Sequence, residues 1–288
     1  MQITPKIHAV KIPFEIPVSA ETKLERFVYA YTISSDVLVL IDSGVAGAKK
    51  VIFRALEKQG RNPSEIDVLL LTHSHPDHIG GASGIKNISN CKIWSHPDAR
   101  AWVENVDKQF SDRPVPGFHA LVEGSVSIER ELNDLEVVEL GDTSLQVIYT
   151  PGHSRCSLSL FCEESGVLFT GDAIPQGNDL PIYDDVGLAV QSIKRLKGIV
   201  DVQHILSSWS DPSLDENPEE VMDGGLQYFQ RIHTVVRQVM HAKQVVEPMD
   251  LCREVVGILG LPELAINPLV AKSLFSHKRF IEKEFIHS

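Results

Sequence analysis

Short apolar runs separated by turn-forming residues dominate the first two thirds of the chain. The run Val68-Leu69-Leu70-Leu71 has the length and composition of a buried strand. Residues 34–36, Ser-Ser-Asp, join the apolar runs 27–33 and 37–41 and have the composition of a turn. We therefore expect strands over residues 7–12, 27–33, 37–41, 68–72, 92–95, 135–140, 144–149, 157–161, 167–170 and 204–209.

Apolar residues at helical spacing lie between several of these strands. In residues 47–59 they repeat every three or four positions, and Gly60 closes the pattern. Residues 107–127 show no clear periodicity. We expect helices over residues 47–59, directly after Gly80-Gly81, over 97–106 and over 186–200.

The last part of the chain has helical patterns and no expected strand. From Pro218 onward a single apolar stripe recurs every three or four residues, formed by Leu226, Phe229, Ile232, Val236 and Val239. This tail is too short to be predicted as an independent domain. We predict a main domain over residues 1–212 and a helical extension over 213–288 that packs on it.

Composition narrows the class of protein. The 288 residues can bury one large core, and the net charge of -12 argues against nucleic acid or an anionic membrane as the main partner. No stretch approaches the ~20 apolar residues of a membrane helix, and the first residues lack a secretion signal. The four cysteines show no paired spacing and are expected to be reduced, namely Cys91, Cys156, Cys162 and Cys252. We therefore expect a cytoplasmic protein.

Metal-ligand residues follow the run at 68–71 directly. Residues 72–81 read Thr-His-Ser-His-Pro-Asp-His-Ile-Gly-Gly, so three imidazoles and a carboxylate lie within six positions. Burying such a cluster without a ligand would leave many polar atoms unpartnered. Imidazole and carboxylate are ligands of zinc and iron, so the segment predicts half of a metal site made of His73, His75, Asp77 and His78.

Three other expected strands also end in candidate ligands. The strand over 144–149 leads to Pro151-Gly152-His153, the strand over 167–170 leads to Asp172, and the strand over 37–41 leads to Asp42. Because strand ends gather at one site in layered α/β proteins, these side chains are expected to converge. A first site would hold one ion through His73, His75 and His153. A second site would hold another through Asp77, His78 and a bridging Asp172.

These motifs resemble the metallo-β-lactamase fold superfamily. The resemblance rests on His-x-His-x-Asp-His, then Pro-Gly-His, then Gly-Asp, preceded by Ile-Asp-Ser-Gly, and it covers roughly residues 27–210. It implies an α/β fold, a four-layer αββα sandwich with the metals at one edge of two facing sheets. It also implies that Asp42 supports the site without being a ligand. The cofactor would be one or two Zn²⁺ ions, with Fe or Mn as alternatives.

One departure from the family pattern concerns the last metal ligand, which the superfamily takes from a histidine after the final strand. Trp209 occupies that place here, and an indole N–H only donates. His204 lies five residues upstream, ~16 Å along a strand, whereas Asp211 is ~7 Å along an extended chain and could substitute. We therefore predict a complete first site and a weakened or altered second site.

The resemblance implies a hydrolase in which a metal-bound hydroxide attacks a carbonyl, with Asp77 orienting it and carrying a proton to the leaving group. The helical extension resembles glyoxalase II-like thioesterases, so a thioester, a lactone or a related small ester ranks first. Two alternatives stay open. One is a mononuclear iron dioxygenase of the persulfide-dioxygenase type, and the other is a phosphodiesterase or RNA-processing hydrolase, which the acidic composition disfavours.

Further residues are candidates for contact with a small-molecule substrate, namely Trp209, Tyr183 and Arg155. For Arg155 a surface ion pair is an equal alternative. The basic cluster expected for glutathione binding is not evident. We expect neither a membrane nor a nucleic acid as partner, and a homodimer stays open.

Overall fold

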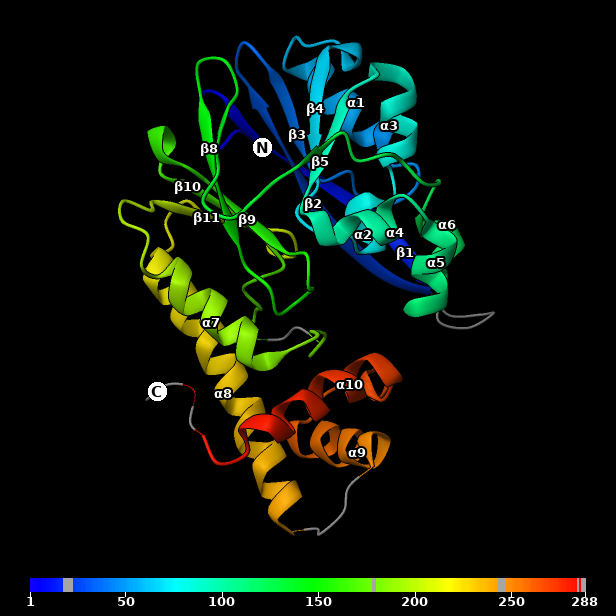
Figure 1. Ribbon diagram of the computed structural model, residues 1–288, viewed down its shortest axis with the longest axis vertical. Coiled ribbons are helices and arrows are strands. Elements are labelled where there is room, and N and C mark those ends of the chain that lie inside the picture. Colours follow the sequence, from blue (N-terminus) through cyan, green and yellow to red (C-terminus); the bar gives the residue numbers. More distant parts are fainter. Residues whose placement is uncertain (18–22, 178–179, 243–246, 284, 286–288) are drawn as a thin grey trace.

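Two β-sheets face one another and carry helices on their outer faces (Figure 1). The computed structural model describes residues 1–17, 23–177, 180–242, 247–283 and 285. The first sheet has the order β1-β2-β3-β4-β5-β6. Its strands are β1 (Ile7–Pro17), β2 (Lys23–Ser34), β3 (Leu38–Ile41), β4 (Ile66–Leu70), β5 (Lys92–Ser95) and β6 (Arg130–Glu131).

The pairing within this sheet changes direction once. β1, β2 and β3 are antiparallel neighbours, while β3, β4, β5 and β6 run parallel. Parallel strands need crossover segments, which here carry helices. Consequently the carboxyl ends of β3 and β4 lie side by side, because Ile41 pairs with Leu70. Asp42 and the residues that follow β4 therefore start from one edge of the sheet.

The second sheet has the order β11-β10-β9-β8-β7. Only β10 and β11 are parallel, and the other pairs are antiparallel. The parallel pair places the segments that follow β10 and β11 next to each other. The strands are β7 (Val137–Glu139), β8 (Ser144–Tyr149), β9 (Leu158–Cys162), β10 (Val167–Gly171) and β11 (His204–Ser207).

Helices cover the outer face of the first sheet. The longer ones, α1 (Lys49–Lys58) and α3 (Ala82–Ser89), contribute Ile52, Leu56 and Ile85 to a core with Leu40 and Leu69. Alternation along the strands sends successive side chains to opposite faces, so one face meets these helices and the other meets the second sheet. Shorter helices lie together at the lower end of this sheet in Figure 1, namely α2 (Pro76–Ile79), α4 (Arg100–Val103), α5 (Val106–Asp112) and α6 (Phe118–Leu121).

A separate core fills the space between the sheets. It combines residues of the first sheet, such as Ile41 and Leu70, with residues of the second, such as Val147, Leu160 and Phe169. All five are nearly inaccessible to solvent. Burial of apolar area on this scale is the main favourable term that holds the two sheets together.

The outer face of the second sheet packs against α7 (Val186–Leu196) and the C-terminal helices. Ile148, Phe161 and Leu168 of the sheet share one core with Ile193 of α7 and with α8 (Pro218–Ala242). That same core continues into α9 (Pro248–Leu259) and α10 (Pro268–Ser276). The helical tail is thus packed on the sandwich, and the predicted αββα fold is confirmed.

Two differences from the expected elements concern the segment without periodicity. Helices α5 and α6 lie within or overlap residues 107–127, and the two-residue strand β6 follows. Helices of seven and four residues offer too few positions for an apolar repeat to be recognised. In α5 the buried residue is a polar one, Gln109, which no hydrophobic pattern would select.

Candidate metal centre

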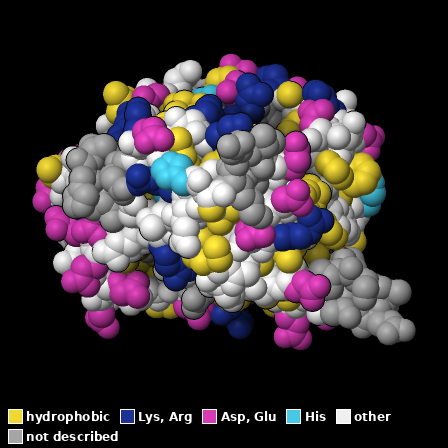
Figure 2. Space-filling view, turned by 90° about the horizontal axis from the view of Figure 1, so that it is seen from below, with side chains coloured by type: hydrophobic (Ala, Val, Ile, Leu, Met, Phe, Trp, Pro, Cys, Tyr) yellow, Lys and Arg dark blue, Asp and Glu magenta, His cyan; other side chains and the backbone are white. Residues whose placement is uncertain are grey.

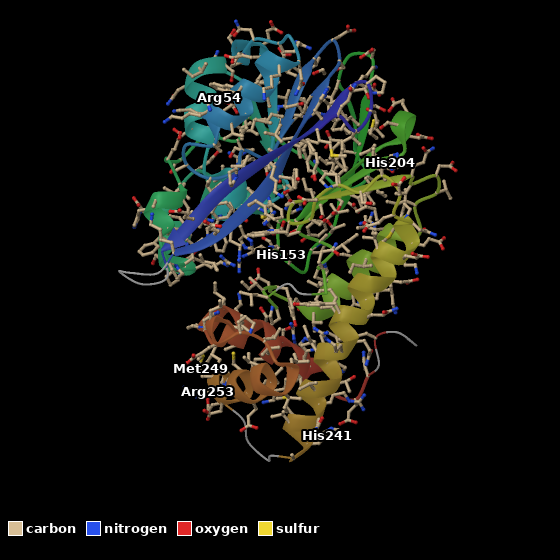
Figure 3. All side chains as sticks on the ribbon, turned by 180° about the vertical axis from the view of Figure 1, so that it is seen from behind. Arg54, His153, His204, His241, Met249 and Arg253 are labelled. Atoms are coloured by element: carbon tan, nitrogen blue, oxygen red, sulfur yellow. The ribbon has the colours of Figure 1, made fainter. Side chains whose placement is uncertain are left out.

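Four chain segments deliver the predicted ligands to one edge of the two sheets. The segment after β4 carries His73 and His75, and α2 carries Asp77 and His78. Pro76 is the first residue of α2, where its missing N–H costs nothing, and it keeps His75 extended with φ -69° and ψ 152°. The other two segments, after β8 and after β10, bring His153 and Asp172. His153 lies at the end of the sandwich that faces the C-terminal helices (Figure 3).

The three imidazoles of the predicted first site meet nitrogen to nitrogen. His73 Nε2 lies 3.0 Å from His75 Nδ1, which lies 2.9 Å from His153 Nε2. These atoms all fall within 4.8 Å of one another, and His73 and His75 are almost fully buried. Three ring nitrogens directed at one point suit the tetrahedral coordination of zinc, which leaves a fourth position open.

A second group shares His73 and adds His78 and Asp172. His78 Nε2 lies 3.2 Å from Asp172 Oδ1 and 3.4 Å from Asp77 Oδ2. His78 Nε2 and Asp172 Oδ1 are both buried and have no hydrogen-bond partner. Buried polar atoms without partners are costly, and a metal ion between them would satisfy both. Of the two carboxylates near His78 Nε2, Asp77 is more exposed than Asp172, with 17% of its side-chain surface accessible to solvent.

Asp42 contacts the candidate ligand segment through Thr72 and His78. Its Oδ1 accepts the Thr72 backbone N–H at 2.8 Å, and its Oδ2 accepts the Thr72 hydroxyl at 2.8 Å. The same Oδ2 lies 2.8 Å from His78 Nδ1. Asp42 has a φ of 60°, and aspartate is one of the few residues other than glycine that visit this region routinely. Asp42 belongs to neither group of candidate ligand atoms, and its supporting role stays a prediction.

These bonds also select the tautomers of two ligands. Because the Thr72 hydroxyl donates to Asp42, it can only accept at its 3.1 Å contact with His73 Nδ1. His73 therefore carries its proton on Nδ1, and its Nε2 lone pair is free. In its neutral form His78 likewise keeps its proton on Nδ1, where Asp42 accepts it, and its Nε2 lone pair is then free. Such support fixes ring orientation and raises ligand basicity.

The pKa values of the four histidines of the site shift in two directions. Burial lowers the pKa of His73 and His75 well below the ordinary value, and burial also lowers the pKa of His153. Burial acts the same way on His78, but Asp172, Asp42 and Asp77 together raise its pKa well above the ordinary value. The first-site imidazoles are therefore neutral at neutral pH, which is the form that binds metal.

The turn that carries His153 is packed tightly. Gly152 has a φ of 138°, and a Cβ there would lie 2.3 Å from the backbone N and Cα of Ala189 in α7. The backbone N–H of Asp184 donates to the Gly152 carbonyl at 2.8 Å. Only glycine fits this position, and α7 together with the loop before it fixes where His153 lies.

Trp209 lies beside Asp172, as the parallel pairing of β10 and β11 requires. Its indole Nε1 donates to Asp172 Oδ2 at 3.0 Å, and its ring packs edge-on against Phe14 with centroids 6.2 Å apart. The resemblance implies an imidazole nitrogen that binds a metal at this position. This chain has an indole N–H there, which donates to Asp172, the predicted bridging ligand. The ligand set of the second site lacks that histidine.

The three other candidate residues lie outside both groups. Asp211 is exposed, and its Oδ1 accepts from Lys11 Nζ at 2.5 Å and from the Tyr29 hydroxyl at 2.8 Å, so it does not substitute for the absent ligand. Tyr183 is buried against the C-terminal helices, where its hydroxyl lies 2.7 Å from His277 Nε2. Arg155 is 73% exposed, and its Nε lies 3.7 Å from Asp98 Oδ2. Burial keeps Tyr183 from substrate, and Arg155 takes the surface ion pair.

Two residues near the site carried no sequence signal. Gln109 of α5 is buried, and its Nε2 donates to the Ser74 carbonyl at 2.5 Å, within the metal-ligand segment. Arg113 at the end of α5 interacts electrostatically with Asp77 and Asp172. Both belong to the segment without periodicity, so only the folded arrangement reveals them.

Comparisons of the sequence and of the fold show which known proteins this chain is similar to. A sequence model of the metallo-beta-lactamase superfamily matches residues 24–241. An acyl-coenzyme A thioesterase of Gallus gallus is 32% identical over 141 residues, which cover 45% of this chain and 50% of that protein. A hydroxyacylglutathione hydrolase of Haemophilus influenzae is 29% identical over 140 residues, covering 48% of this chain and 61% of that protein.

Among solved structures, a metallo-beta-lactamase family protein of Thermus thermophilus superposes with a TM-score of 0.73 at 18% identity. That superposition covers 98% of this chain and 94% of the other, so the fold extends through the C-terminal helices. The chain spans about half to two thirds of the length of the curated relatives that it matches. Within the described residues, no helix is long and apolar enough to cross a membrane.

Proposed function

The chain belongs to the metallo-beta-lactamase superfamily, and we propose that it is a metal-dependent hydrolase of a thioester or a related small ester. The observation that carries the proposal is the convergence of His73 Nε2, His75 Nδ1 and His153 Nε2 within 4.8 Å. No packing role explains three imidazole nitrogens that point at one another in a buried site.

The residues fit a metal on two counts. The first site offers three neutral imidazoles, and the second offers the buried unpartnered atoms His78 Nε2 and Asp172 Oδ1. We assign His73, His75 and His153 to a first ion, and Asp77, His78 and Asp172 to a weaker second one. A bound Zn²⁺ ion would polarise the scissile carbonyl and lower the pKa of a coordinated water toward ~7.

The remaining chemistry falls to side chains of this chain. Asp77 is the ligand-segment carboxylate that solvent reaches, so it is suited to carry a proton to the leaving group. Asp42 and Thr72 hold the proton of each neutral ring on Nδ1, so Nε2 of His73 and of His78 is the nitrogen that would bind an ion. Gln109 holds the backbone between His73 and His75 in place through Ser74.

Substrate class is proposed from the relatives. One relative is named as an acyl-coenzyme A thioesterase and another as a hydroxyacylglutathione hydrolase. Both substrates are thioesters, whose carbonyl is more electrophilic than that of an oxygen ester. This supports the ranking of thioesters over lactones and phosphodiesters. On the face seen in Figure 2, described acidic and basic side chains are interspersed, which does not suit a nucleic-acid backbone.

One observation favours a second candidate function, a mononuclear iron dioxygenase of the persulfide-dioxygenase type. Trp209 stands where the superfamily has a second-site ligand, and its Nε1 donates to Asp172 Oδ2. A single ion at the first site is therefore the simplest occupancy. Iron bound by a few histidine and carboxylate ligands with open positions is a common arrangement in oxygenases. Metal preference and oxygen uptake with a persulfide distinguish the two functions.

The test is a substrate panel on protein reconstituted separately with zinc, manganese and iron(II). We expect thioester hydrolysis with zinc or manganese, loss on chelation and recovery on metal addition. His241→Ala is the control, because this histidine is exposed on α8 and lies far along the chain from the site. Oxygen consumption with iron and a persulfide, without thioester hydrolysis, would replace this proposal by the second one.

We further infer a cytoplasmic location from the cysteines, all four of which are free and buried. A homodimer stays a prediction, which sedimentation of the purified chain would test.

A further inference from the structure

Arg113 ends a helix that is fastened to the metal-ligand segment. Its backbone N–H donates to the Gln109 carbonyl at 2.8 Å, and Gln109 Nε2 donates to the Ser74 carbonyl at 2.5 Å. Arg113 directly follows α5 with φ -145° and ψ 75°, and this backbone hydrogen bond keeps it one turn from Gln109. Figure 1 shows α5 at the same end of the first sheet as α2, which carries Asp77.

The surroundings of the Arg113 guanidinium are those of the metal centre. It is partly buried, and three carboxylates act on it electrostatically, from Asp184, Asp77 and Asp172. Its positive charge in turn contributes to lowering the pKa of His73, His75 and His153. Within the described part of the chain the guanidinium forms neither a hydrogen bond nor an ion pair.

Each of these three carboxylates already has another role. Asp184 Oδ1 pairs with Lys272 Nζ at 2.6 Å. Asp77 and Asp172 belong to the predicted second site, where a bound divalent ion would take up their negative charge. A partly buried cation whose nearest carboxylates are engaged elsewhere is costly, and an anion beside its guanidinium would offset that cost.

The other cation near this site is less suited to that role. Arg155 follows His153 by two residues, but it is largely exposed and faces Asp98. Guanidinium groups bind carboxylate and phosphate through two parallel hydrogen bonds, which an exposed and mobile side chain makes only weakly. Arg113 combines enclosure, proximity to the ligands and unused donors.

We propose that Arg113 binds an anionic group of the substrate, a carboxylate or a phosphate close to the scissile bond. The substrate class thereby narrows from thioesters to anionic thioesters. This inference rests on the proposed hydrolase function for its substrate, but its geometry is independent of the reaction. The anion can belong to the acyl part or to the thiol part of the substrate.

The first experiment compares three thioesters on the zinc-loaded enzyme: a neutral one, one with a carboxylate on the acyl part and one with a carboxylate on the thiol part. Arg113→Gln is expected to lower kcat/KM for one of the anionic thioesters by about 10- to 100-fold, the range of a hydrogen bond to a charged group. The neutral thioester should be unaffected, and Arg113→Lys should retain part of the preference because the charge remains. Arg155→Gln is the matched control and should leave all three rates unchanged.

The second experiment needs no turnover. Binding of 3-mercaptopropionate and of its neutral amide to the zinc-loaded protein is measured by titration calorimetry. Wild type should bind the acid more tightly, by about tenfold or more, and Arg113→Gln should remove that preference while thermal melting shows the fold intact. Equal binding of acid and amide by wild type, or an unchanged preference in Arg113→Gln, would overturn the proposal.

The two experiments separate this inference from the proposed function. If no thioester is hydrolysed but Arg113 still selects the acid, the hydrolase assignment fails and the anion site stands. If thioesters are hydrolysed but Arg113→Gln slows neutral and anionic ones equally, the hydrolase stands and Arg113 has only a structural role.

Discussion

Replacing Trp209 by histidine should turn a site with one tightly bound ion into a site with two. The perturbation changes a donor into an acceptor at the position beside Asp172. In the native chain the indole Nε1 donates to Asp172 Oδ2 at 3.0 Å, which weakens the carboxylate whose Oδ1 faces His78 Nε2 as a metal ligand. An imidazole at the same place supplies a nitrogen lone pair instead.

The magnitude follows from the bond that is lost and the ligand that is gained. A hydrogen bond to a charged group contributes about 1.5–3 kcal/mol, which corresponds to about 10- to 100-fold in affinity. Trp209→Phe removes this hydrogen bond without adding a ligand, so it should strengthen second-ion binding by at most that factor. Trp209→His adds a ligand as well and should exceed Trp209→Phe.

The assay is equilibrium dialysis against buffered zinc with metal analysis of the protein. We expect one tight equivalent in wild type and two in Trp209→His, with Trp209→Phe between them. Both substitutions remove the edge-on contact with Phe14, so thermal melting accompanies the measurement. Two equally tight ions in wild type, or one ion in Trp209→His with the fold intact, would refute the reasoning.

Three further predictions concern the support of the site and the C-terminal helices. Asp42→Asn tolerates the positive φ but removes the charge, so we expect about 1–3 kcal/mol lower unfolding free energy in urea and weaker metal binding. Gly152→Ala forces a Cβ to within 2.3 Å of Ala189 and should abolish hydrolysis and lower the melting temperature. Burial lowers the pKa of His277 well below 6.5, so the unfolded chain takes up the proton first as pH falls. His277 should therefore contribute a loss of stability below pH 6.5 of up to about 1.4 kcal/mol per pH unit, so the slope should be smaller in His277→Gln and unchanged in His241→Gln.

Each of these has a result that would count against it. Asp42→Asn with native stability and metal content would show that the Asp42 charge is dispensable. Gly257→Ala is the control for Gly152→Ala, because nothing lies within 4 Å of a Cβ there, and it should be neutral or slightly stabilising. Full activity in Gly152→Ala would mean that the turn adapts. If the stability of His277→Gln depends on pH as strongly as that of wild type, His277 is not the source of the dependence.

The sequence predicted the strands and the candidate ligands because their signals are local and repeated, whereas the sandwich was implied by the resemblance to the superfamily. Each strand of the core carries its own apolar run, and each ligand follows a strand end, so the ligand order could be obtained from spacing. Trp209 was identified as the departure because a single position after the last strand decides it. Its bond to Asp172 depends on the parallel pairing of β10 and β11, which no local pattern reveals.

What the sequence could not predict depends on contacts between distant segments. Tyr183 borders the site in the sequence, yet it is buried against α10 because the C-terminal helices cover its loop. Asp211 lies two residues from Trp209, but the Tyr29 hydroxyl and Lys11 hold its carboxylate at the surface. Arg113 directly follows a short helix without periodicity, and only its electrostatic proximity to the ligand segment makes it a candidate for substrate binding.

The central claim is that the three converging imidazoles hold the ion that hydrolysis requires. It is tested most directly by zinc content and thioester hydrolysis measured together on wild type and His73→Ala. The account predicts that His73→Ala loses the tight ion and that kcat/KM falls by about 10³-fold or more, since several kcal/mol of charge stabilisation depend on the ion. Hydrolysis at the wild-type rate in His73→Ala would contradict it.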